Sequence, residues 1–292
     1  MSNTFRLHSL TEVFAICKLP PANPIPKWAT MGETWSVTRT PTELSCVCPE
    51  GNVPPTIRAE RDWRALQVEG PLPFTMVGVL SSILDTLAND GISVFVLSTF
   101  DTDLILVRTE QFSEACARLN NAGHTIVEVR SSPIQGLGVF ALAPYSAGQC
   151  IREITVVREI TPEAPLREEL GELADHCDYP DGRVVLLGFP DRHINHSCDP
   201  NAYVQYKQDH SFLCARRDIT VGEEITCDYN MNITGGTSWP CHCGAARCRG
   251  ETIGDFFKLP IGIQLEYQPQ LAEWFVRRHQ EALAQLISRR PV

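Results

Sequence analysis

The sequence has no apolar run long enough to cross a bilayer. The longest candidate, residues 72–84, falls short of the roughly 18 residues required and is bounded by Glu69 and Asp85. The opening residues are interrupted by charged side chains such as Arg6 and lack the apolar core of a secretory signal. We therefore expect a protein that does not span a membrane and that works in a reducing, cytoplasmic compartment.

An excess of basic residues is also missing. Lys and Arg total 25 against 35 Asp and Glu, which gives a formal net charge of −10. A protein that grips the phosphate backbone relies on a basic surface, so direct nucleic-acid binding is not expected. Basic peptides and small molecules remain compatible partners. The 292 residues, 43% of them hydrophobic, are enough for about two globular domains.

The second half of the N-terminal region has a regular alternation of strand-like and helix-like periods. Residues 79–87 carry a helical stripe that ends at Asn89-Asp90-Gly91, and a second helix is expected over residues 110–119. Strands are expected at residues 72–76, 92–97, 104–107 and 124–129. The predicted order is βαββαβ. A looser version, with strands at residues 5–10, 13–19, 35–38, 44–48 and 65–68, suggests an internal duplication.

This order, and segments such as residues 35–41 and 98–103, resemble tandem ACT domains of the amino-acid-sensing type over residues 4–126. The resemblance implies a small effector, often an amino acid. Gly78 and Asp103 are the candidate contacts, the first through exposed backbone and the second as a carboxylate that receives an amino group. A helix-start glycine and a turn carboxylate are the alternative interpretations. ACT units often pair, so a homodimer is a further expectation.

From about residue 127 the pattern changes to short strands and many turns, with no Pro/Ser/Gly-rich linker before it. Such a pattern predicts a β-rich domain with irregular loops. Strands are expected at residues 127–130, 138–141, 151–157, 184–187, 202–205, 213–216 and 224–226. Residues 271–287 predict one amphipathic helix with Leu271, Trp274, Phe275, Ala282, Leu283 and Leu286 on its apolar face. The fold class is therefore α+β.

Three of the twelve cysteines lie within eight positions, at Cys241, Cys243 and Cys248. This spacing is too tight for three independent core thiols and suits thiolate ligation of zinc, with a fourth ligand supplied from elsewhere. A chance cluster of buried thiols is the alternative.

The segment from Arg192 to Asn201 is rich in hydrogen-bonding groups and indicates a site loop. Taken together with Gly136-Leu137-Gly138, with residues 223–229 and with the cysteine cluster, it resembles the SET-domain protein-lysine methyltransferases with a post-SET segment. The resemblance covers residues 127 to about 260. It implies that Cys198 is the fourth zinc ligand, which gives a closed and therefore structural site.

The same resemblance implies methyl transfer from S-adenosylmethionine to the ε-amine of a lysine in a protein or peptide. Tyr229 is the predicted catalytic residue, orienting the amine through its hydroxyl. Cofactor contacts are predicted for Gly136, Leu137, Gly138, Arg192, Asn195 and His196. A structural salt bridge is an equal interpretation of Arg192, and a metal-ligand or general-base role for His196 ranks below its cofactor role.

The sequence departs from the family pattern at two places. At residues 154–158 an aromatic residue of the site is replaced, and the second departure is at Gly188-Phe189. No cysteine-rich pre-SET segment precedes the domain. These departures motivate an alternative function, a non-catalytic, amino-acid-responsive protein that uses the SET fold to hold a cofactor or partner. The expected domains are residues 1–126 (ACT-like), 127–238 (SET), 239–254 (post-SET zinc segment) and 255–292 (helical tail).

Overall fold

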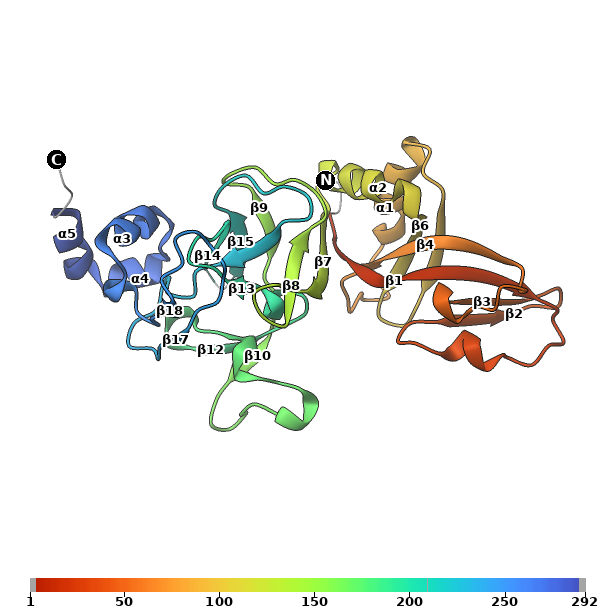
Figure 1. Cartoon of the computed structure of the whole chain (residues 1–292), viewed down its shortest axis with the longest axis horizontal. Helices are drawn as coiled ribbons and strands as arrows, with labels where there is room; N and C mark the ends of the chain where they lie inside the picture. Colours follow the sequence, from red (N-terminus) through yellow and green to blue (C-terminus); the bar gives the residue numbers. More distant parts are fainter. Residues whose placement is uncertain (1–3, 209, 289–292) are drawn as a thin grey trace. The chain divides into compact units, whose positions relative to one another are not determined.

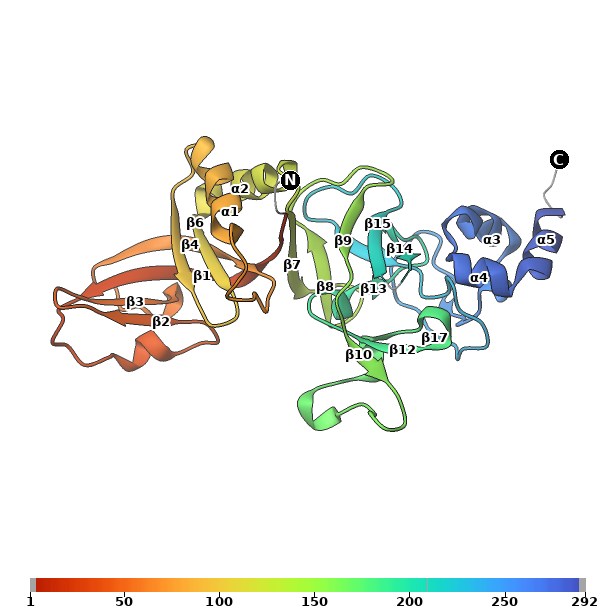
Figure 2. The same cartoon turned by 180° about the vertical axis from the view of Figure 1, so that it is seen from behind.

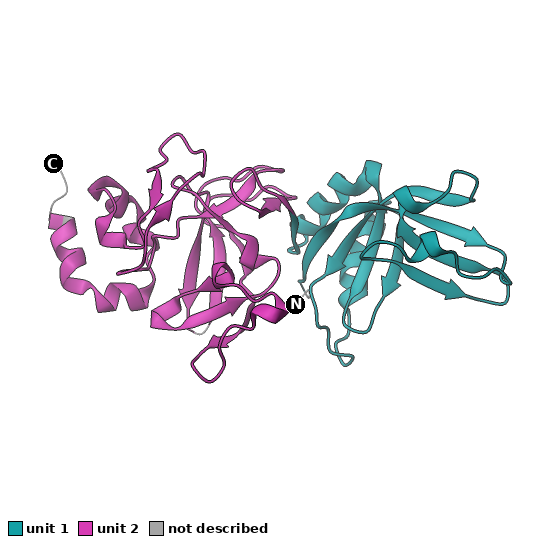
Figure 3. Cartoon of the chain, turned by 60° about the horizontal axis from the view of Figure 1, so that its bottom comes forward, with its two compact units in different colours: residues 1–129 teal, residues 130–292 magenta. Residues whose placement is uncertain are grey.

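The computed structural model describes residues 4–208 and 210–288. The chain divides into two compact units, Met1–Val129 and Arg130–Val292 (Figure 3). The sequence placed this division between residues 126 and 127. Residues 1–3, 209 and 289–292, which fall within the expected domains, lie outside the described residues. No helix in the described part of the chain has the length and apolar character needed to cross a membrane.

The first unit is a mixed sheet with strand order β7-β1-β4-β6-β5, and its two α-helices lie next to each other on one side of it (Figure 1). Among the described strands of this unit, only the β1–β7 pairing is parallel. The elements are β1 (Arg6–Leu19), β2 (Ser36–Arg39), β3 (Leu44–Pro49), β4 (Ala59–Val68), α1 (Val79–Asn89), β5 (Val94–Ser98), β6 (Asp103–Arg108), α2 (Thr109–Asn121) and β7 (Thr125–Ser131), with short 3-10 helices at Lys27–Thr30 and Glu50–Asn52.

The predicted βαββαβ order is present as β4-α1-β5-β6-α2-β7. Helix α1 forms where its apolar stripe buries Val79, Ile83 and Leu87, four residues apart, against the sheet. The first strand is not where the sequence placed it. Residues 72–76 form a loop, because prolines at positions 71 and 73 remove two backbone donors that a ladder needs, and β4 takes the strand's place.

The first half of this unit differs from the suspected duplication. Residues 4–57, all of them described, contain strands and two 3-10 turns but no α-helix. The two expected strands at residues 5–10 and 13–19 are one long strand, β1. Its beginning pairs with β7 and its end pairs with β3, in register from Phe14↔Pro49 to Leu19↔Leu44. One strand therefore serves both the ACT-like sheet and the β2-β3 extension.

The second unit is β-rich, as predicted, with short strands in several small sheets and helices gathered at its C-terminal end (Figure 2). The strands pair as β13-β16-β8, β10-β12-β11, β14-β15-β9 and β17-β18. Its strands are β8 (Leu137–Ala141), β9 (Cys150–Glu153), β10 (Val156–Ile160), β11 (Cys177–Asp178), β12 (Val184–Leu187), β13 (Asn195–His196), β14 (Ala202–Lys207), β15 (His210–Ala215), β16 (Glu224–Cys227), β17 (Trp239–Pro240) and β18 (Glu251–Thr252).

The single helix predicted over residues 271–287 is a chain of shorter ones. The predicted range contains α4 (Glu273–Arg278) and α5 (Gln280–Ser288), and a further helix, α3 (Ile261–Tyr267), precedes it. Helix α4 ends at Arg278, and the following residue, His279, has a φ of −118° and a ψ of 30°, which are not helical. The His279 ring packs against Phe275, with 4.5 Å between ring centroids, and this aromatic contact accompanies the break.

Candidate active site

The site loop and the acidic segment predicted from sequence meet as two adjacent strands. β13 runs parallel to β16, with Asn195 opposite Thr226 and His196 opposite Cys227. The amide of Asn201 ties the two together. Its oxygen accepts from the Thr226 backbone N–H at 2.9 Å, and its nitrogen donates to the Glu224 carbonyl at 2.8 Å. Asn201 is 1% exposed, so the loop is fixed by a fully buried side chain.

The glycine turn lies beside this pair of strands and is held by Asn195. The Asn195 side-chain nitrogen donates to the Leu137 carbonyl at 2.9 Å and to the Glu224 carboxylate at 2.8 Å. A Cβ at Gly138 would lie 2.3 Å from the Glu224 carboxylate oxygen, so a larger residue here would displace Glu224 from its hydrogen bonds with Ser132 and Asn195. Gly136 differs. Its φ is +50° and a Cβ there would meet nothing within 4 Å, which leaves its side of the turn open.

Tyr229 follows β16 and is held at both ends. Its backbone N–H donates to His196 Nδ1 at 3.1 Å, and its hydroxyl donates to the Ile194 carbonyl at 2.6 Å. Burial, reinforced by the nearby Cys227, Asp175 and Asp178, raises the pKa of the phenol well above its ordinary value. The hydroxyl is therefore uncharged at neutral pH. Its oxygen keeps lone pairs that can accept a further hydrogen bond.

His196 links Tyr229 to the cysteine cluster. The ring is 7% exposed, and burial lowers its pKa to about 4, so it is neutral at physiological pH. Because Nδ1 accepts from Tyr229, we assign the ring proton to Nε2, which lies 3.4 Å from Cys198 Sγ. Both ring nitrogens are thus committed within the protein.

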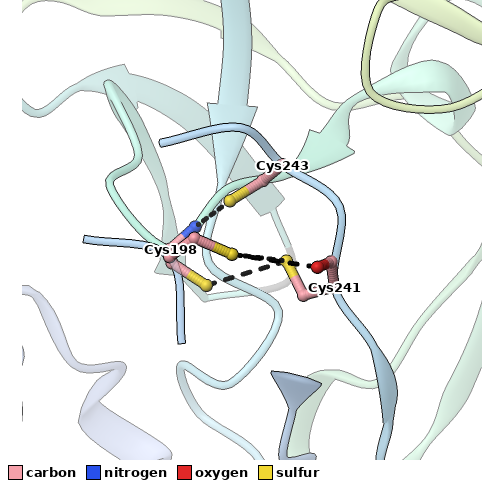
Figure 4. Close-up of side chains that lie close together, drawn as sticks. Cys198, Cys241 and Cys243 are labelled. Carbon is pink, nitrogen blue, oxygen red and sulfur yellow. Dashed lines mark hydrogen bonds between the residues drawn. The ribbon is translucent and has the colours of Figure 1, made fainter. Parts of the chain in front are cut away.

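The four predicted cysteines converge in the second unit. The Sγ atoms of Cys198, Cys241, Cys243 and Cys248 all lie within 4.8 Å of one another. Figure 4 shows three of these side chains pointing toward a common centre, although Cys198 lies more than forty positions before the others in the chain. The Sγ atom of Cys241 lies 3.7 Å from that of Cys198 and 3.8 Å from that of Cys248.

These separations fit zinc. Four thiolates at about 2.3 Å from a tetrahedral ion lie about 3.8 Å from one another. Backbone N–H groups surround the sulfurs as well. The N–H of Cys198 donates to Cys243 Sγ, and that of Arg249 to Cys198 Sγ, both at 3.4 Å. A site with four protein ligands has no open coordination position, so the predicted role of the metal is structural.

Asp228 joins the elements around the cluster, a role that sequence reasoning missed. Its side chain is 0% exposed and forms an ion pair with Arg249 at 2.7 Å. The Tyr267 hydroxyl of α3 donates to the same carboxylate at 3.0 Å, and the Asn230 side chain donates at 2.6 Å. Asp228 therefore ties the residue before Tyr229 to the zinc segment and to the C-terminal helices. No local pattern signals Tyr267 as its partner, because the contact spans 39 positions.

A cavity of about 380 Å³ lies against Tyr229. Its walls combine aromatic side chains with the backbone of a glycine-containing loop. The lining residues are Tyr179, Gly182, Tyr229, Asn232, Ile233, Thr234, Gly235, Gly236, Thr237, Trp239, Gly254, Trp274, Phe275, Arg278 and His279. Trp274 and Phe275, which the sequence analysis took only as the apolar face of a helix, thus also form part of this wall.

Of the remaining predicted site residues, Arg192 lies in the site loop, in the 3-10 helix Asp191–His193 just before β13. Arg192 is exposed and donates to His193 Nε2 at 3.2 Å. Within the described part of the chain no carboxylate lies within 4.0 Å of its guanidinium, so the salt-bridge interpretation is not supported. Gly78 and Asp103 belong to the first unit. Gly78 precedes α1 with a φ of +86°, and Asp103 accepts a hydrogen bond from Ser98 at 2.5 Å. Each thus has a local structural role.

Family models match two parts of the chain that these features define. The model of the SET domain matches residues 136–230, which include the glycine turn, the site loop and Tyr229. Residues 136–230 are a SET domain. The ACT-domain model matches residues 58–121, and a model of another N-terminal domain matches residues 12–56. The recognition of SET and ACT domains is therefore confirmed, with the ACT match confined to the βαββαβ part of the first unit.

Relatives of the SET-containing region are histone-lysine methyltransferases. The chain is 31% identical over 182 residues to human histone-lysine N-methyltransferase 2D, which covers 56% of this chain and 3% of that protein. It is 30% identical over 147 residues to the H3 lysine-36 specific enzyme of Candida albicans, covering 45% of this chain and 17% of that protein. The solved structure of KRYPTONITE in complex with mCHG DNA and SAH is 25% identical, with 44% and 29% coverage and a TM-score of 0.34. The chain thus spans only a small part of each relative.

Proposed function

We propose that this protein is a protein-lysine methyltransferase that uses S-adenosylmethionine. Support comes from the SET domain over residues 136–230 and from relatives named as histone-lysine methyltransferases. The observation that carries the proposal is the position of Tyr229. Its hydroxyl is anchored on the Ile194 carbonyl, and the residue lines a partly aromatic cavity large enough for a side chain such as lysine.

The residues around the glycine turn fit a bound nucleoside cofactor. Gly136 offers open space beside its backbone, and Leu137 keeps 44% of its surface exposed next to it. The side chains of Asn195 and His196 are already hydrogen bonded within the protein. We therefore expect backbone atoms of these two residues to make the predicted contacts with the cofactor. The side chain of Arg192 is exposed and can reach a bound ligand. When bound, the cofactor supplies a methyl group on a cationic sulfur.

Tyr229 would orient the substrate amine. Because its hydroxyl proton is donated to Ile194, the phenolic oxygen is left to accept a hydrogen bond from the amine N–H. An amine held this way points its lone pair in a fixed direction, which is the alignment that displacement at the methyl carbon requires. The amine must be uncharged. Burial and the nearby cationic sulfur both lower a lysine pKa from its usual value near 10.4.

The test is methyl transfer from radiolabelled S-adenosylmethionine to a pool of basic peptides. We expect wild-type protein to incorporate label, and Tyr229→Phe to lower the turnover rate by about 100-fold, since misalignment alone costs on that order. Cofactor affinity, measured by calorimetry, should be unchanged. Tyr203→Phe is the matched control, because Tyr203 lies on β14 away from the cavity lining. Cofactor binding without label incorporation by the wild type would favour the non-catalytic alternative.

We also propose that the ACT-containing unit binds a small effector such as an amino acid, with Gly78 and Asp103 as contacts. The ACT match over residues 58–121 supports a regulatory domain but names no ligand. A thermal-shift panel of the twenty amino acids tests the proposal. One or a few should raise the melting temperature, and Asp103→Asn should remove that rise. A flat response across the panel would contradict it. Light scattering with and without the effective ligand tests the expected homodimer.

A further inference from the structure

One cysteine pair outside the metal centre has an arrangement that the proposed function does not use. All twelve cysteines lie within the described residues, and Cys150 is the only exposed one among them. It begins β9, next to β15 in the second unit. Most of the remaining thiols are buried, and two, Cys177 and Cys248, are partly exposed. Cys150 is therefore the thiol that a dissolved reagent meets first.

Cys150 faces Cys214 across two antiparallel strands. The ladder pairs Phe212 with Glu153 and Leu213 with Arg152, and then shifts so that Cys214 pairs with Cys150. Facing residues in antiparallel strands have Cα atoms about 4.5–5.5 Å apart. A disulfide needs a Cα separation of about 4.4–6.8 Å. The backbone thus holds these two cysteines at a distance that a disulfide can bridge.

The irregularity in the ladder gives the two thiols different exposures. Ile151 is the extra residue of β9, and both Ile151 and Arg152 are 2% exposed, so the strand turns Cys150 outward. Cys214 is 3% exposed. One member of the pair is open to solvent and the other lies underneath it. This is the arrangement of an attacking thiol and a resolving thiol.

The local electrostatics assign the same roles. A hydrogen bond from Cys214, helped by the nearby Lys207, lowers the pKa of Cys150 to about 7. The same hydrogen bond, together with burial, raises the pKa of Cys214 far above its ordinary value. At neutral pH a substantial fraction, about half, of the exposed sulfur is therefore thiolate, while the buried one keeps its proton. The thiolate is the nucleophile in thiol–disulfide exchange.

We propose that Cys150 and Cys214 form a redox-active pair that is oxidised to an intramolecular disulfide by small disulfides such as oxidised glutathione. The Cys150 thiolate attacks one sulfur of the oxidant, forming a mixed disulfide and releasing one glutathione thiolate. The Cys214 sulfur then attacks Cys150 Sγ, and the second glutathione leaves. Two thiols are oxidised, one disulfide is reduced, and the two thiol protons end on the two glutathione molecules.

The experiment treats zinc-loaded, full-length protein with oxidised glutathione at pH 7.5, traps free thiols by alkylation and maps the peptides without reduction. Wild type should yield a peptide pair joined through Cys150 and Cys214 and lighter by two hydrogens than its reduced form. In Cys214→Ser the exchange stops halfway, and Cys150 should carry one stable glutathione. In Cys150→Ser, buried Cys214 should stay unmodified. Cys177→Ser is the matched control and should behave as wild type.

A second measurement needs no variant. In the reduced wild type, Cys150 should react with iodoacetamide at least about fivefold faster than Cys177 at pH 7.5, with a rate that rises around pH 7, since only the thiolate reacts. Accumulation of a stable glutathione adduct on Cys150 in the wild type would overturn the proposal, because the resolving step would be absent. Equal alkylation rates at the two cysteines would overturn it as well.

Discussion

At the scale of single residues, Asp191 stabilises the start of the site loop. Its carboxylate and the guanidinium of Arg152 are both 0% exposed and lie 2.8 Å apart, and the carboxylate also accepts from the Thr155 N–H at 2.9 Å. Asp191 opens the short 3-10 helix Asp191–His193 that leads directly into β13. The ion pair therefore fixes the point from which Asn195 and His196 start.

We expect Asp191→Asn to lower the free energy of unfolding by about 3–5 kcal/mol, because it leaves the Arg152 cation buried without its counter-charge. Urea denaturation measures the loss. The control is Asp181→Asn, which removes an exposed ion pair with Arg278 whose side chains are 48% and 50% exposed. That change should cost less than about 1 kcal/mol. Similar losses in the two variants would show that burial of the Arg152 pair contributes nothing.

Residue by residue, sequence reasoning succeeded where the chemistry is local in the chain. The spacing of Cys241, Cys243 and Cys248 alone predicted thiolate ligation, and the structure assembles that site with Cys198. Only the family resemblance supplied Cys198. Asp191 and Asp228 were not predicted as supports, because a carboxylate's partner tens of residues away leaves no periodic signal. The tight contact between Gly138 and Glu224 was not predicted, because nothing in the local sequence pairs these two residues, and the cofactor contact of Gly138 stays a prediction.

At the scale of elements, the cysteine cluster holds together segments that have little regular structure. The segment from β17 to β18 carries three of the four cysteines, and each of these strands has only two residues. So short a hairpin has too few backbone hydrogen bonds to be stable by itself. The metal is therefore expected to supply most of the folding free energy of this segment.

Removal of zinc should unfold the post-SET segment and leave the first unit intact. We expect a chelator to release one zinc per chain, to speed hydrogen exchange in residues 239–252, and to expose Arg247 and Arg249 to trypsin. Cys198→Ser should have the same effect without chelator, whereas Cys177→Ser should not. Unchanged exchange in residues 239–252 after complete zinc loss would contradict this role of the metal.

Element prediction was most accurate where a strand or helix has its own periodicity. Strand β12 (Val184–Leu187) and helices α1 and α2 lie where the sequence placed them, within a few residues. The two-residue strands β11, β13, β17 and β18 were not predicted, because two residues carry no alternation. The break between α4 and α5 was missed for a different reason. The apolar stripe continues across His279, and only the contact of its ring with Phe275 distinguishes the break.

At the scale of the whole molecule, acid stability depends on carboxylates that bind arginines from distant parts of the chain. Glu266 on α3 accepts from Arg247 at 2.9 Å and also pairs with Arg216, which follows β15. The hydrogen bond from Arg247, with help from Arg216, lowers the pKa of Glu266 to about 2. A carboxylate with a depressed pKa stabilises the fold above its ordinary pKa of 4.5. That stabilisation is lost as the pH falls toward 2.

Glu266→Gln should accordingly lower the free energy of unfolding by about 1 kcal/mol at pH 7, a modest value because the Glu266 side chain is 34% exposed and screened by water. The difference in the free energy of unfolding between the variant and the wild type should become smaller as the pH falls below 4.5. Urea titrations at pH 7, 5 and 3 measure it. Exposed Glu281 on α5 offers the control Glu281→Gln, which should follow wild type throughout. A gap that stays constant to pH 3 would rule out this ion-pair contribution.

For the molecule as a whole, the α+β class and the order of ACT region, SET domain and helical tail were predicted correctly. The suspected second ACT copy was drawn from strand-like residues alone. Without α-helices in residues 4–57, all of them described, those strands have a different organisation, and a different family model matches residues 12–56. Sheet order could not be predicted, because alternation shows that a strand is half-buried but not which neighbour it has.

The place of β1 in the first sheet has a consequence for how this unit folds. β1 lies between β4 and β7, and its parallel partner β7 follows it by more than a hundred residues. During synthesis one edge of β1 stays unpaired until β7 has left the ribosome. Such distant pairings slow folding, and open strand edges invite association with other chains. The nascent N-terminal unit therefore exposes this edge of β1 to other chains until residues 125–128 have been synthesised.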